Sequence, residues 1–157
     1  MRKLDPLEAT LHLMLNSDTH KKKTMRQFAN TAMPPIIHNQ FLLWISDDGL
    51  PIGYVSWARL TPSIAEEYTA NGIRNMKFDE WTGGEQFWFI NFICPYGGAL
   101  SMVRSIYDAL PDVNNAFIRR VKKDGTVRIG RYGRAAFSTT PQEQTPGWAD
   151  ETGPGVH

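Results

Sequence analysis

Residues 85–100 read EQFWFINFICPYGGAL and contain a long apolar run that a single amide side chain, Asn91, interrupts. Nearly continuous apolar sequence over residues 86–93 is typical of a central strand that is buried on both faces. The glycine pair Gly97-Gly98 then marks a turn that leads into an apolar helix. The stretch predicts a central strand, a turn and a helix, and it leaves a buried amide to be explained.

Helix and strand patterns alternate along the rest of the chain. Apolar spacing and capping residues predict helices over residues 6–16, 25–33, 63–72 and 100–110. Runs rich in branched and aromatic residues, separated by turn residues, predict strands over residues 40–45, 52–58, 86–93, 116–121 and 126–131. This order predicts an α+β (mixed α/β) domain with a central, mostly antiparallel sheet flanked by helices.

Two details of the first two helices follow from their sequences. In the first helix, Leu11 and Leu15 share a helical stripe with Leu7 and Met14, so we expect them to be buried. In the second, the pair Pro34-Pro35 is expected to end the helix, because proline lacks the N–H that a helix needs.

Length and composition fit one domain. The chain has 157 residues and is 41% hydrophobic, which suffices for a single core. We expect the domain to cover residues 1–137 and the polar residues 138–157 to form a disordered tail.

Charge and cysteine content exclude several classes of protein. The net charge is +1, from 17 basic and 16 acidic side chains, which argues against a non-specific nucleic-acid binder. One cysteine forms no intrachain disulfide, and neither a signal peptide nor a span of about 20 apolar residues is present. These features predict a soluble cytoplasmic protein without a membrane span.

The turn at Gly97 and Gly98 is a candidate anion site. Free backbone amides and the helix dipole both face whatever lies at such a strand-to-helix turn. In N-acetyltransferases this position binds the phosphate of a pantetheine donor, although the glycine spacing usual in coenzyme A binders is missing here. The alternative is a tight turn with no ligand.

Several motifs together resemble the RTX toxin-activating lysine acyltransferases. They are, in chain order, DPLE (5–8), SDTH (17–20), QFLL (40–43), PIGYVSWA (51–58), DEWTGG (79–84) and WFINFICPYG (88–97). The resemblance implies a fold similar to N-acetyltransferases, often dimeric. It also implies transfer of a fatty acyl group from acyl carrier protein to internal lysines of an RTX protoxin in the bacterial cytoplasm, with no metal and no cofactor besides the acyl donor.

The resemblance places the functional histidine of that family at His20, within a Ser-x-x-His pattern that begins at Ser17. An attacking lysine is protonated at neutral pH, and a neutral imidazole is a suitable general base to deprotonate it. Ser17 hydrogen-bonds the imidazole or the loop backbone, or it caps a helix. The alternative for His20 is a solvated loop histidine.

The family's second functional residue is an aspartate, and Asn91 takes its place in this chain. Asparagine cannot accept a proton or stabilise a cation by charge. Asn91 could act as an orienting or oxyanion-stabilising amide. Alternatively Asp79 or Glu80 supplies the missing carboxylate, or the protein is a weakened or non-catalytic relative that binds carrier or toxin.

Other side chains give further alternatives. Cys94 could form an acyl-enzyme, but a cysteine at the end of an apolar strand is usually a small buried hydrophobe. Acyl carrier proteins are acidic and could dock on either of two basic groups by electrostatic steering. The groups are Lys21, Lys22 and Lys23, and the last hairpin with Arg119, Arg120, Lys122, Lys123, Arg128, Arg131 and Arg134. An acyl-coenzyme A-dependent N-acyltransferase is the nearest alternative enzyme.

Overall fold

The computed structural model describes residues 4–134, except for the side chains of residues 74 and 75. The expected domain end at residue 137 and the expected tail, residues 138–157, lie outside the described residues.

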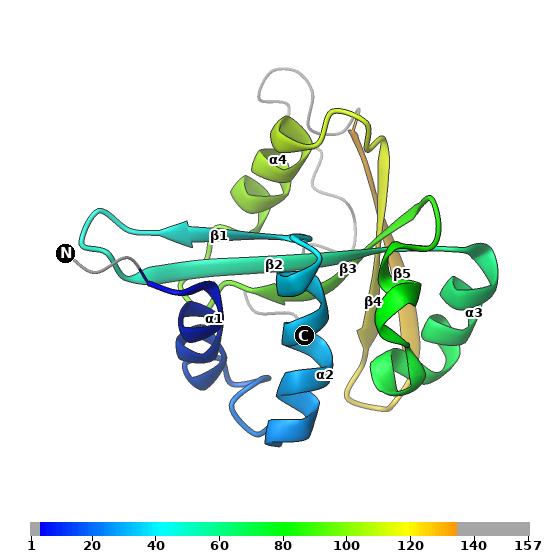
Figure 1. The fold of residues 1–157 in the computed structure, drawn as a ribbon, viewed down its shortest axis with the longest axis horizontal. Helices are drawn as coiled ribbons and strands as arrows, with labels where there is room; N and C mark the ends of the chain where they lie inside the picture. The colour runs from blue at the N-terminus through cyan, green and yellow to red at the C-terminus, as the bar shows by residue number, and fades with distance from the viewer. Residues whose placement is uncertain (1–3, 135–157) are drawn as a thin grey trace.

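One five-stranded sheet organises the described chain (Figure 1). Its strands lie side by side in chain order: β1 (Phe41–Ile45), β2 (Pro51–Leu60), β3 (Gln86–Ile93), β4 (Asn115–Val121) and β5 (Val127–Gly133). Pairing is antiparallel except between β3 and β4, which run parallel. The predicted α+β domain with a mostly antiparallel sheet is therefore confirmed, and each predicted strand is present.

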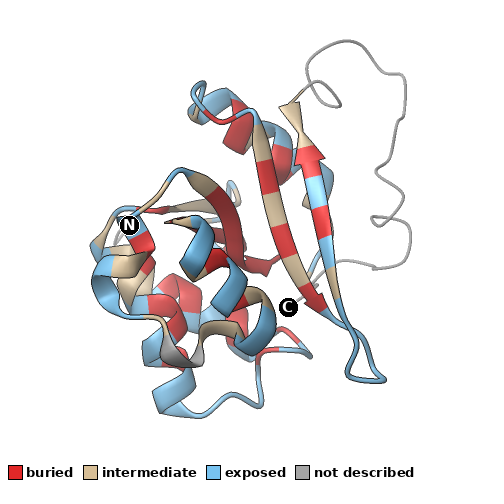
Figure 2. Cartoon of the chain, turned by 90° about the vertical axis from the view of Figure 1, so that its right-hand side faces the viewer, coloured by how far each residue is buried: buried red, intermediate tan, exposed pale blue. Residues whose placement is uncertain are grey.

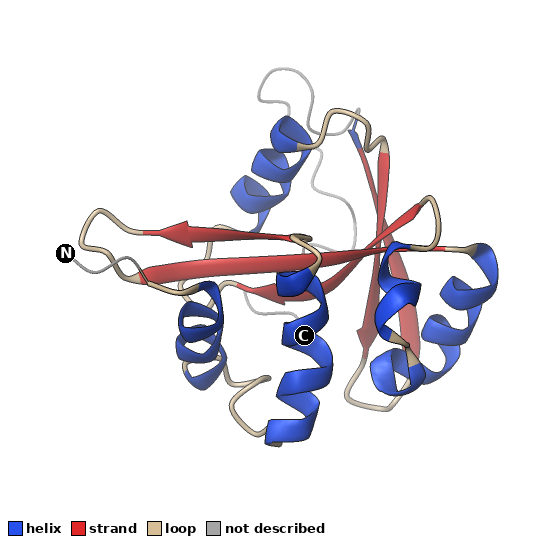
Figure 3. Cartoon of the chain, in the orientation of Figure 1, coloured by secondary structure: helices blue, strands red, loops and turns tan. Residues whose placement is uncertain are grey.

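Helices cover both faces of this sheet (Figure 3). They are α1 (Pro6–Leu15), α2 (Met25–Ile37), α3 (Pro62–Asn71) and α4 (Ala99–Ala109), with 3-10 turns η1 (Gly72–Asn75) and η2 (Phe78–Thr82). Figure 1 shows α1 and α2 together on one side of β1–β3 and α4 on the opposite side. We call these the α1/α2 face and the α4 face.

The predicted start of α1 is confirmed, but its predicted buried face is partly wrong. Asp5 caps the helix by accepting a hydrogen bond from Leu7 N at 2.8 Å. Leu13 and Met14 are buried, whereas Leu11 and Leu15 are 39% and 61% exposed. Leucines at alternating positions in this helix fit two helical stripes equally well, so the contacts with the sheet decide which one is buried.

Helix α2 does not end at its proline pair. It starts with a capping box at Thr24 and Gln27, and it continues through Pro34 and Pro35 to Ile37. The prediction that the prolines end the helix is therefore wrong. Each proline leaves the carbonyl four residues earlier without its usual helical donor.

Strand β3 carries an irregularity next to its amide. Ser56 of β2 pairs with Asn91 but the next residue of β2, Trp57, pairs with Phe89, so Ile90 is an extra residue in β3. The bulge shifts the alternation of side chains. Phe89 packs on the α4 face, whereas Ile90 and Asn91 contact groups on the other face of the sheet.

The sheet changes direction where β3 meets β4. Only three residue pairs join the two strands, at Phe87, Trp88 and Phe89 of β3. In Figure 1 the β4–β5 hairpin crosses the direction of β1–β3 at a steep angle. Figure 2 shows buried residues alternating with intermediate ones along β4 and with exposed ones along part of β5, as expected for a sheet with one packed face.

Candidate functional site

The loop between α1 and α2 carries the two residues of the Ser-x-x-His pattern, and it buries both. His20 is 2% exposed and Ser17 is 3% exposed. Nδ1 of the imidazole lies 2.7 Å from Ser17 Oγ and 3.0 Å from Thr19 Oγ1. The alternative of a solvated loop histidine is therefore wrong for His20, and of the alternatives for Ser17 the contact with the imidazole is present.

Burial determines the charge of this imidazole. Loss of hydration lowers the pKa of His20 to about 3, and the nearby Lys23 ammonium contributes to the same shift. The ring is therefore neutral at physiological pH. A neutral imidazole carries one proton, and a proton on Nδ1 can be donated to the hydroxyl oxygen of Ser17 or Thr19.

The other ring nitrogen, Nε2, is buried and has no hydrogen-bond partner among residues 4–134. Such a group is unusual in a folded protein, because burying a polar atom without a partner costs free energy. With the proton on Nδ1, Nε2 carries a free lone pair and has the chemistry of a base. Because Nε2 is buried, a substrate can reach this atom only if the residues around it move.

Asn91 is held by the fold on the α1/α2 face. Its amide nitrogen Nδ2 donates to the carbonyl oxygen of Thr31 at 2.9 Å and to Ser56 Oγ at 3.0 Å. Its backbone N–H also donates to Ser56 Oγ, at 3.2 Å. Both protons of Nδ2 are thereby used, and the oxygen Oδ1 takes part in neither bond.

A buried tyrosine extends this polar group. Tyr54 lies two residues before Ser56 on β2, so the two side chains point to the same face of the sheet. Burial raises the pKa of Tyr54, and the hydroxyls of Ser56 and Thr10 oppose the shift in part. The phenol is neutral, and its oxygen has no partner in hydrogen-bonding geometry among the described residues.

Sequence reasoning missed the residues that surround Asn91. Thr31 contributes only its backbone carbonyl, which no side-chain pattern reveals. Tyr54 and Ser56 did give a signal, because polar atoms two residues apart in an otherwise apolar strand lie on one face. Pairing that signal with Asn91 would have required the register of β2 and β3.

The structure does not join the two principal candidates directly. Within residues 4–134, His20 and Asn91 share no hydrogen bond. Helix α2 links them, because the helix begins five residues after His20 and accepts the Asn91 amide at Thr31.

The glycine turn lies between β3 and α4. Gly97 and Gly98 have φ values of +91° and +90°, a region that residues with a side chain rarely adopt. A Cβ at either position would meet no atom within 4 Å, so backbone conformation rather than space selects glycine. Gly98 precedes the first turn of α4 and provides no side-chain cap.

The alternative carboxylates occupy other positions. Asp79 is exposed in η2, and Glu80 accepts a hydrogen bond from Lys77 N at 2.8 Å. Glu80 thus serves as a cap for its own turn. Neither carboxylate hydrogen-bonds to His20 or Asn91 in the described part of the chain.

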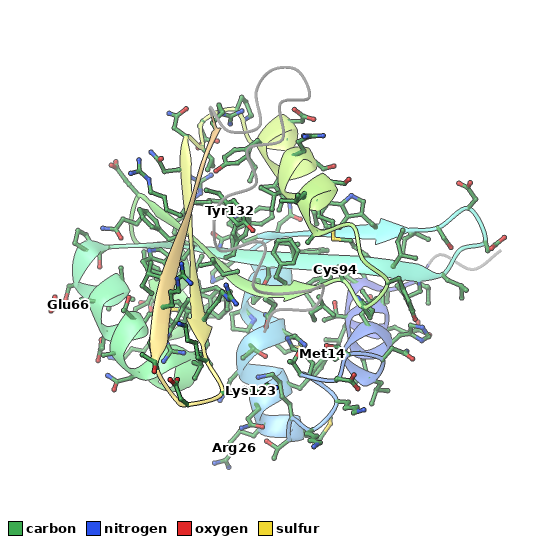
Figure 4. The ribbon with its side chains drawn as sticks, turned by 180° about the vertical axis from the view of Figure 1, so that it is seen from behind. Met14, Arg26, Glu66, Cys94, Lys123 and Tyr132 are labelled. Carbon is green, nitrogen blue, oxygen red and sulfur yellow. The ribbon has the colours of Figure 1, made fainter. Side chains whose placement is uncertain are left out.

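Cys94 is fully buried in the apolar cluster of the α4 face. Figure 4 shows it inside the molecule near the start of α4. This environment is that of a small hydrophobe, and it gives the thiol no access to a substrate.

The basic groups differ in how their side chains are used. Lys22 and Lys123 are exposed, and Figure 4 shows Lys123 at the tip of the β4–β5 hairpin. Arg119 Nε donates to Thr69 O at 3.0 Å. Arg134 donates to Val113 O at 2.8 Å and to two carbonyls at the end of α4.

Comparison with known proteins adds an independent result. The HlyC model, which describes the RTX toxin acyltransferase family, matches residues 2–129. The chain is 29% identical over 138 residues to the protein-lysine myristoyltransferase RtxC of Kingella kingae, an alignment that covers 85% of this chain and 80% of that protein. It is 30% identical over 129 residues to the protein-lysine myristoyltransferase HlyC of Escherichia coli, covering 80% and 73%. It is 31% identical over 133 residues to the leukotoxin-activating lysine-acyltransferase LktC, serotype T3, of Mannheimia haemolytica, covering 83% and 78%.

Proposed function

This chain belongs to the RTX toxin acyltransferase family of protein-lysine acyltransferases, and we propose that it transfers a fatty acyl group from acyl carrier protein to internal lysines of an RTX protoxin. The observation that carries the proposal is the buried, neutral imidazole of His20, with Nδ1 next to two hydroxyls and Nε2 without a partner. We place the reaction in the bacterial cytoplasm. No helix within residues 4–134 is long and apolar enough to cross a membrane.

His20 acts as the general base in this mechanism. Opening of the loop admits the lysine ammonium and hydrates the imidazole, which returns its pKa towards 6.5. Nε2 then accepts a proton from the ammonium, and the neutral amine attacks the thioester carbonyl. The new C–N bond forms as the C–S bond breaks, and the imidazolium returns its proton to the departing thiolate. The neutral imidazole then takes the second proton from the nitrogen and releases it to solvent, which leaves a neutral amide and a thiol. Ser17 and Thr19 fix the ring through Nδ1.

Asn91 acts without charge in this scheme. Both of its amide protons are bonded within the fold, which favours an orienting role over donation to an oxyanion. The absence of a carboxylate at this position supports direct proton transfer to His20. A second candidate function is that of a non-catalytic relative that binds carrier or toxin. Two observations favour it: the missing carboxylate at position 91 and the burial of His20 Nε2.

The donor arm is proposed to lie at the turn formed by Gly97 and Gly98. Amides of the first turn of α4 are free to bind an anion there. A likeness to the N-acetyltransferase fold is also proposed; the turn follows β3, which pairs with β4 in parallel at only three residue pairs. The exposed lysines of the 21–23 loop and of the β4–β5 hairpin are the proposed docking sites for the acidic carrier.

A homodimer is proposed on the basis of the edge strand β1. All five of its residues are apolar, and Ile45 is 43% exposed. An edge strand presents unpaired backbone groups with which a strand of another chain can pair. Sedimentation of the natural chain and of an Ile45→Lys variant would test the assignment, with the variant expected to be monomeric.

The main experiment is peptide mass spectrometry of a protoxin after incubation with this protein and acyl carrier protein carrying a fatty acyl group. We expect new acyl-lysines with the carrier-linked donor and none with His20→Ala. His12→Ala is the matched control, since His12 is exposed on α1 and should be dispensable. Equal transfer from acyl-coenzyme A would favour the coenzyme A-dependent alternative. Absence of any transfer despite carrier or toxin binding would favour the non-catalytic alternative.

A further inference from the structure

Helix α2 contains a backbone carbonyl that its own helix cannot satisfy. In an α-helix the carbonyl of residue 31 would accept a hydrogen bond from the N–H of residue 35, or in a tighter turn from residue 34. Both of those residues are prolines, Pro34 and Pro35, and neither has an N–H. The carbonyl of Thr31 therefore needs a donor from elsewhere.

That need is strict at Thr31 because the residue is buried. Thr31 is 4% exposed, and a buried carbonyl without a donor is costly. Asn30, whose carbonyl loses its donor to Pro34, is exposed and can be hydrated. The two prolines therefore differ in effect, because only Pro35 removes the helical donor of a buried residue's carbonyl, that of Thr31.

Asn91 supplies the missing donor from the central strand. Its Nδ2 lies 2.9 Å from the carbonyl oxygen of Thr31, and the bond is buried. Since a carbonyl oxygen can only accept, the nitrogen end of the Asn91 amide must face helix α2. The second proton of Nδ2 goes to Ser56 Oγ, which fixes the amide plane.

We propose that Asn91 is a positioning residue, which replaces the amide proton that Pro35 removes from α2 and thereby fixes the helix and the preceding His20 loop on the sheet. The loop is tied to the start of the helix, because Lys23 N donates to His20 O at 3.0 Å and Thr24 caps α2. The effect of Asn91 on catalysis through the His20 loop rests on the proposed acyl transfer. The replacement of the missing Pro35 donor by the Asn91 amide, which we call the hydrogen-bond exchange, does not.

The exchange explains why an amide and not a carboxylate occupies this strand position. An ionised aspartate at position 91 would place a negative oxygen against the Thr31 carbonyl, and both groups are acceptors only. Only a protonated carboxyl could donate there. Asparagine at 91 and proline at 35 therefore form a matched pair, and replacing Pro35 by a residue with an N–H should relax the requirement for the amide.

The test is a set of thermodynamic cycles on the full chain. Asn91→Ala and Asn91→Asp are each made in the natural sequence, in Pro35→Ala and in Pro34→Ala, and the unfolding equilibrium is measured in urea. In the natural sequence Asn91→Ala should lower the folding equilibrium constant by about 30-fold, because it leaves Thr31 O unsatisfied. In Pro35→Ala the same change should cost at least five-fold less. In the control, Pro34→Ala, the restored N–H has the carbonyl of Asn30 as its α-helical acceptor, so the cost should fall much less than in Pro35→Ala.

The proposal would be overturned if Asn91→Ala cost the same stability in the natural and Pro35→Ala sequences. It would also be overturned if Pro34→Ala reduced that cost as much as Pro35→Ala does. If Asn91→Asp does not fold alone, recovery of a folded protein by adding Pro35→Ala supports the pair. If neither protein folds, the cycles with Asn91→Ala decide.

A kinetic measurement separates positioning from simple stability. At saturating donor and protoxin, under conditions where every variant is folded, Asn91→Ala should lower kcat at least ten-fold, and adding Pro35→Ala should restore at least half of the loss on a logarithmic scale. Pro35→Ala should not restore His20→Ala. A coupled stability cycle with kcat unchanged by Asn91→Ala would overturn the positioning role. If the natural chain transfers no acyl group at all, the proposed function fails, while the urea cycles still decide the hydrogen-bond exchange.

Discussion

Ser17 Oγ lies 2.7 Å from His20 Nδ1 in a loop that buries both residues, so a hydroxyl is in place to accept a proton from Nδ1. A hydroxyl that accepts the Nδ1 proton leaves the lone pair on Nε2. Thr19 Oγ1, at 3.0 Å, is a second acceptor for the same proton. The first prediction concerns the division of work between these two hydroxyls.

Ser17→Ala should lower kcat of acyl transfer by about 10-fold, because the shorter of two hydrogen bonds to Nδ1 is lost. Thr19→Val should have a smaller effect, and the double variant a larger one than either. Initial rates of acyl-lysine formation, measured by mass spectrometry, would check the order. If Ser17→Ala were fully active while the double variant was inactive, Thr19 alone would orient the ring.

Burial of His20 predicts a dependence of stability on pH. The folded pKa of about 3 lies below the ordinary value of 6.5, so between these values the unfolded state binds a proton that the folded state does not. The contribution of His20 to stability is complete above pH 6.5 and is lost as pH falls, by about 1.4 kcal/mol per pH unit for a single group. Urea unfolding of the natural chain and of His20→Asn from pH 4 to pH 8 should differ in slope by about one proton. Identical slopes would show that His20 is hydrated in the folded protein.

Cys94→Ala should retain full acyl transfer, because the thiol is buried in the apolar cluster of the α4 face and has no access to a thioester. The change removes one buried heavy atom and should lower the unfolding free energy by about 1 kcal/mol. Intact-mass analysis after incubation with the acyl donor alone provides the direct check. A stable acyl adduct on the enzyme that disappears in Cys94→Ala would restore the covalent mechanism.

Carrier binding should weaken with salt if either lysine group docks it. Charge reversal at Lys122 and Lys123, or at Lys21 and Lys22, identifies the group by which pair reduces affinity and flattens the salt dependence. These residues are exposed, so folding should be unaffected. Affinity that is constant from 50 mM to 500 mM salt would argue against both groups.

Arg134→Ala should destabilise the fold by about 2 kcal/mol, because the guanidinium donates to carbonyls of Tyr107, Leu110 and Val113 where α4 leads into β4. Arg134→Lys should recover only part of the loss, since an ammonium lacks the planar fork that reaches three acceptors. Thermal unfolding of the three proteins would check the order. An alanine variant as stable as the natural chain would mean that water replaces these bonds.

Local chemistry made part of this fold predictable. The Asp5 cap, the turn glycines and the continuous apolar run of β3 are short-range signals, and the corresponding elements lie where the sequence places them. The buried stripe of α1 was not predictable, because leucines occupy two stripes and the sheet selects one. Likewise, the continuation of α2 through Pro35 was not predictable, because the donor to the Thr31 carbonyl is Asn91, 60 positions away in the chain.

In the candidate site, too, some features could be predicted from local sequence and others depend on tertiary contacts. His20 and Asn91 could be named as candidates from the family resemblance, and the contact of Ser17 with the imidazole was one of several alternatives that its spacing allowed. The burial of His20 could not be predicted, since the polar sequence around it resembles a solvated loop. The role of Asn91 also required three-dimensional information, because its partners are a main-chain carbonyl and a hydroxyl on the neighbouring strand.

The short parallel junction between β3 and β4 has a consequence for the order in which the protein folds. The hairpins β1–β2 and β4–β5 pair strands close in sequence, so each can form early and locally. Joining β3 to β4 requires closure of a chain segment that includes all of α4, and only three residue pairs stabilise the result directly. Docking of the C-terminal hairpin is therefore expected to be the last step of folding, and the first to reverse when the protein begins to unfold.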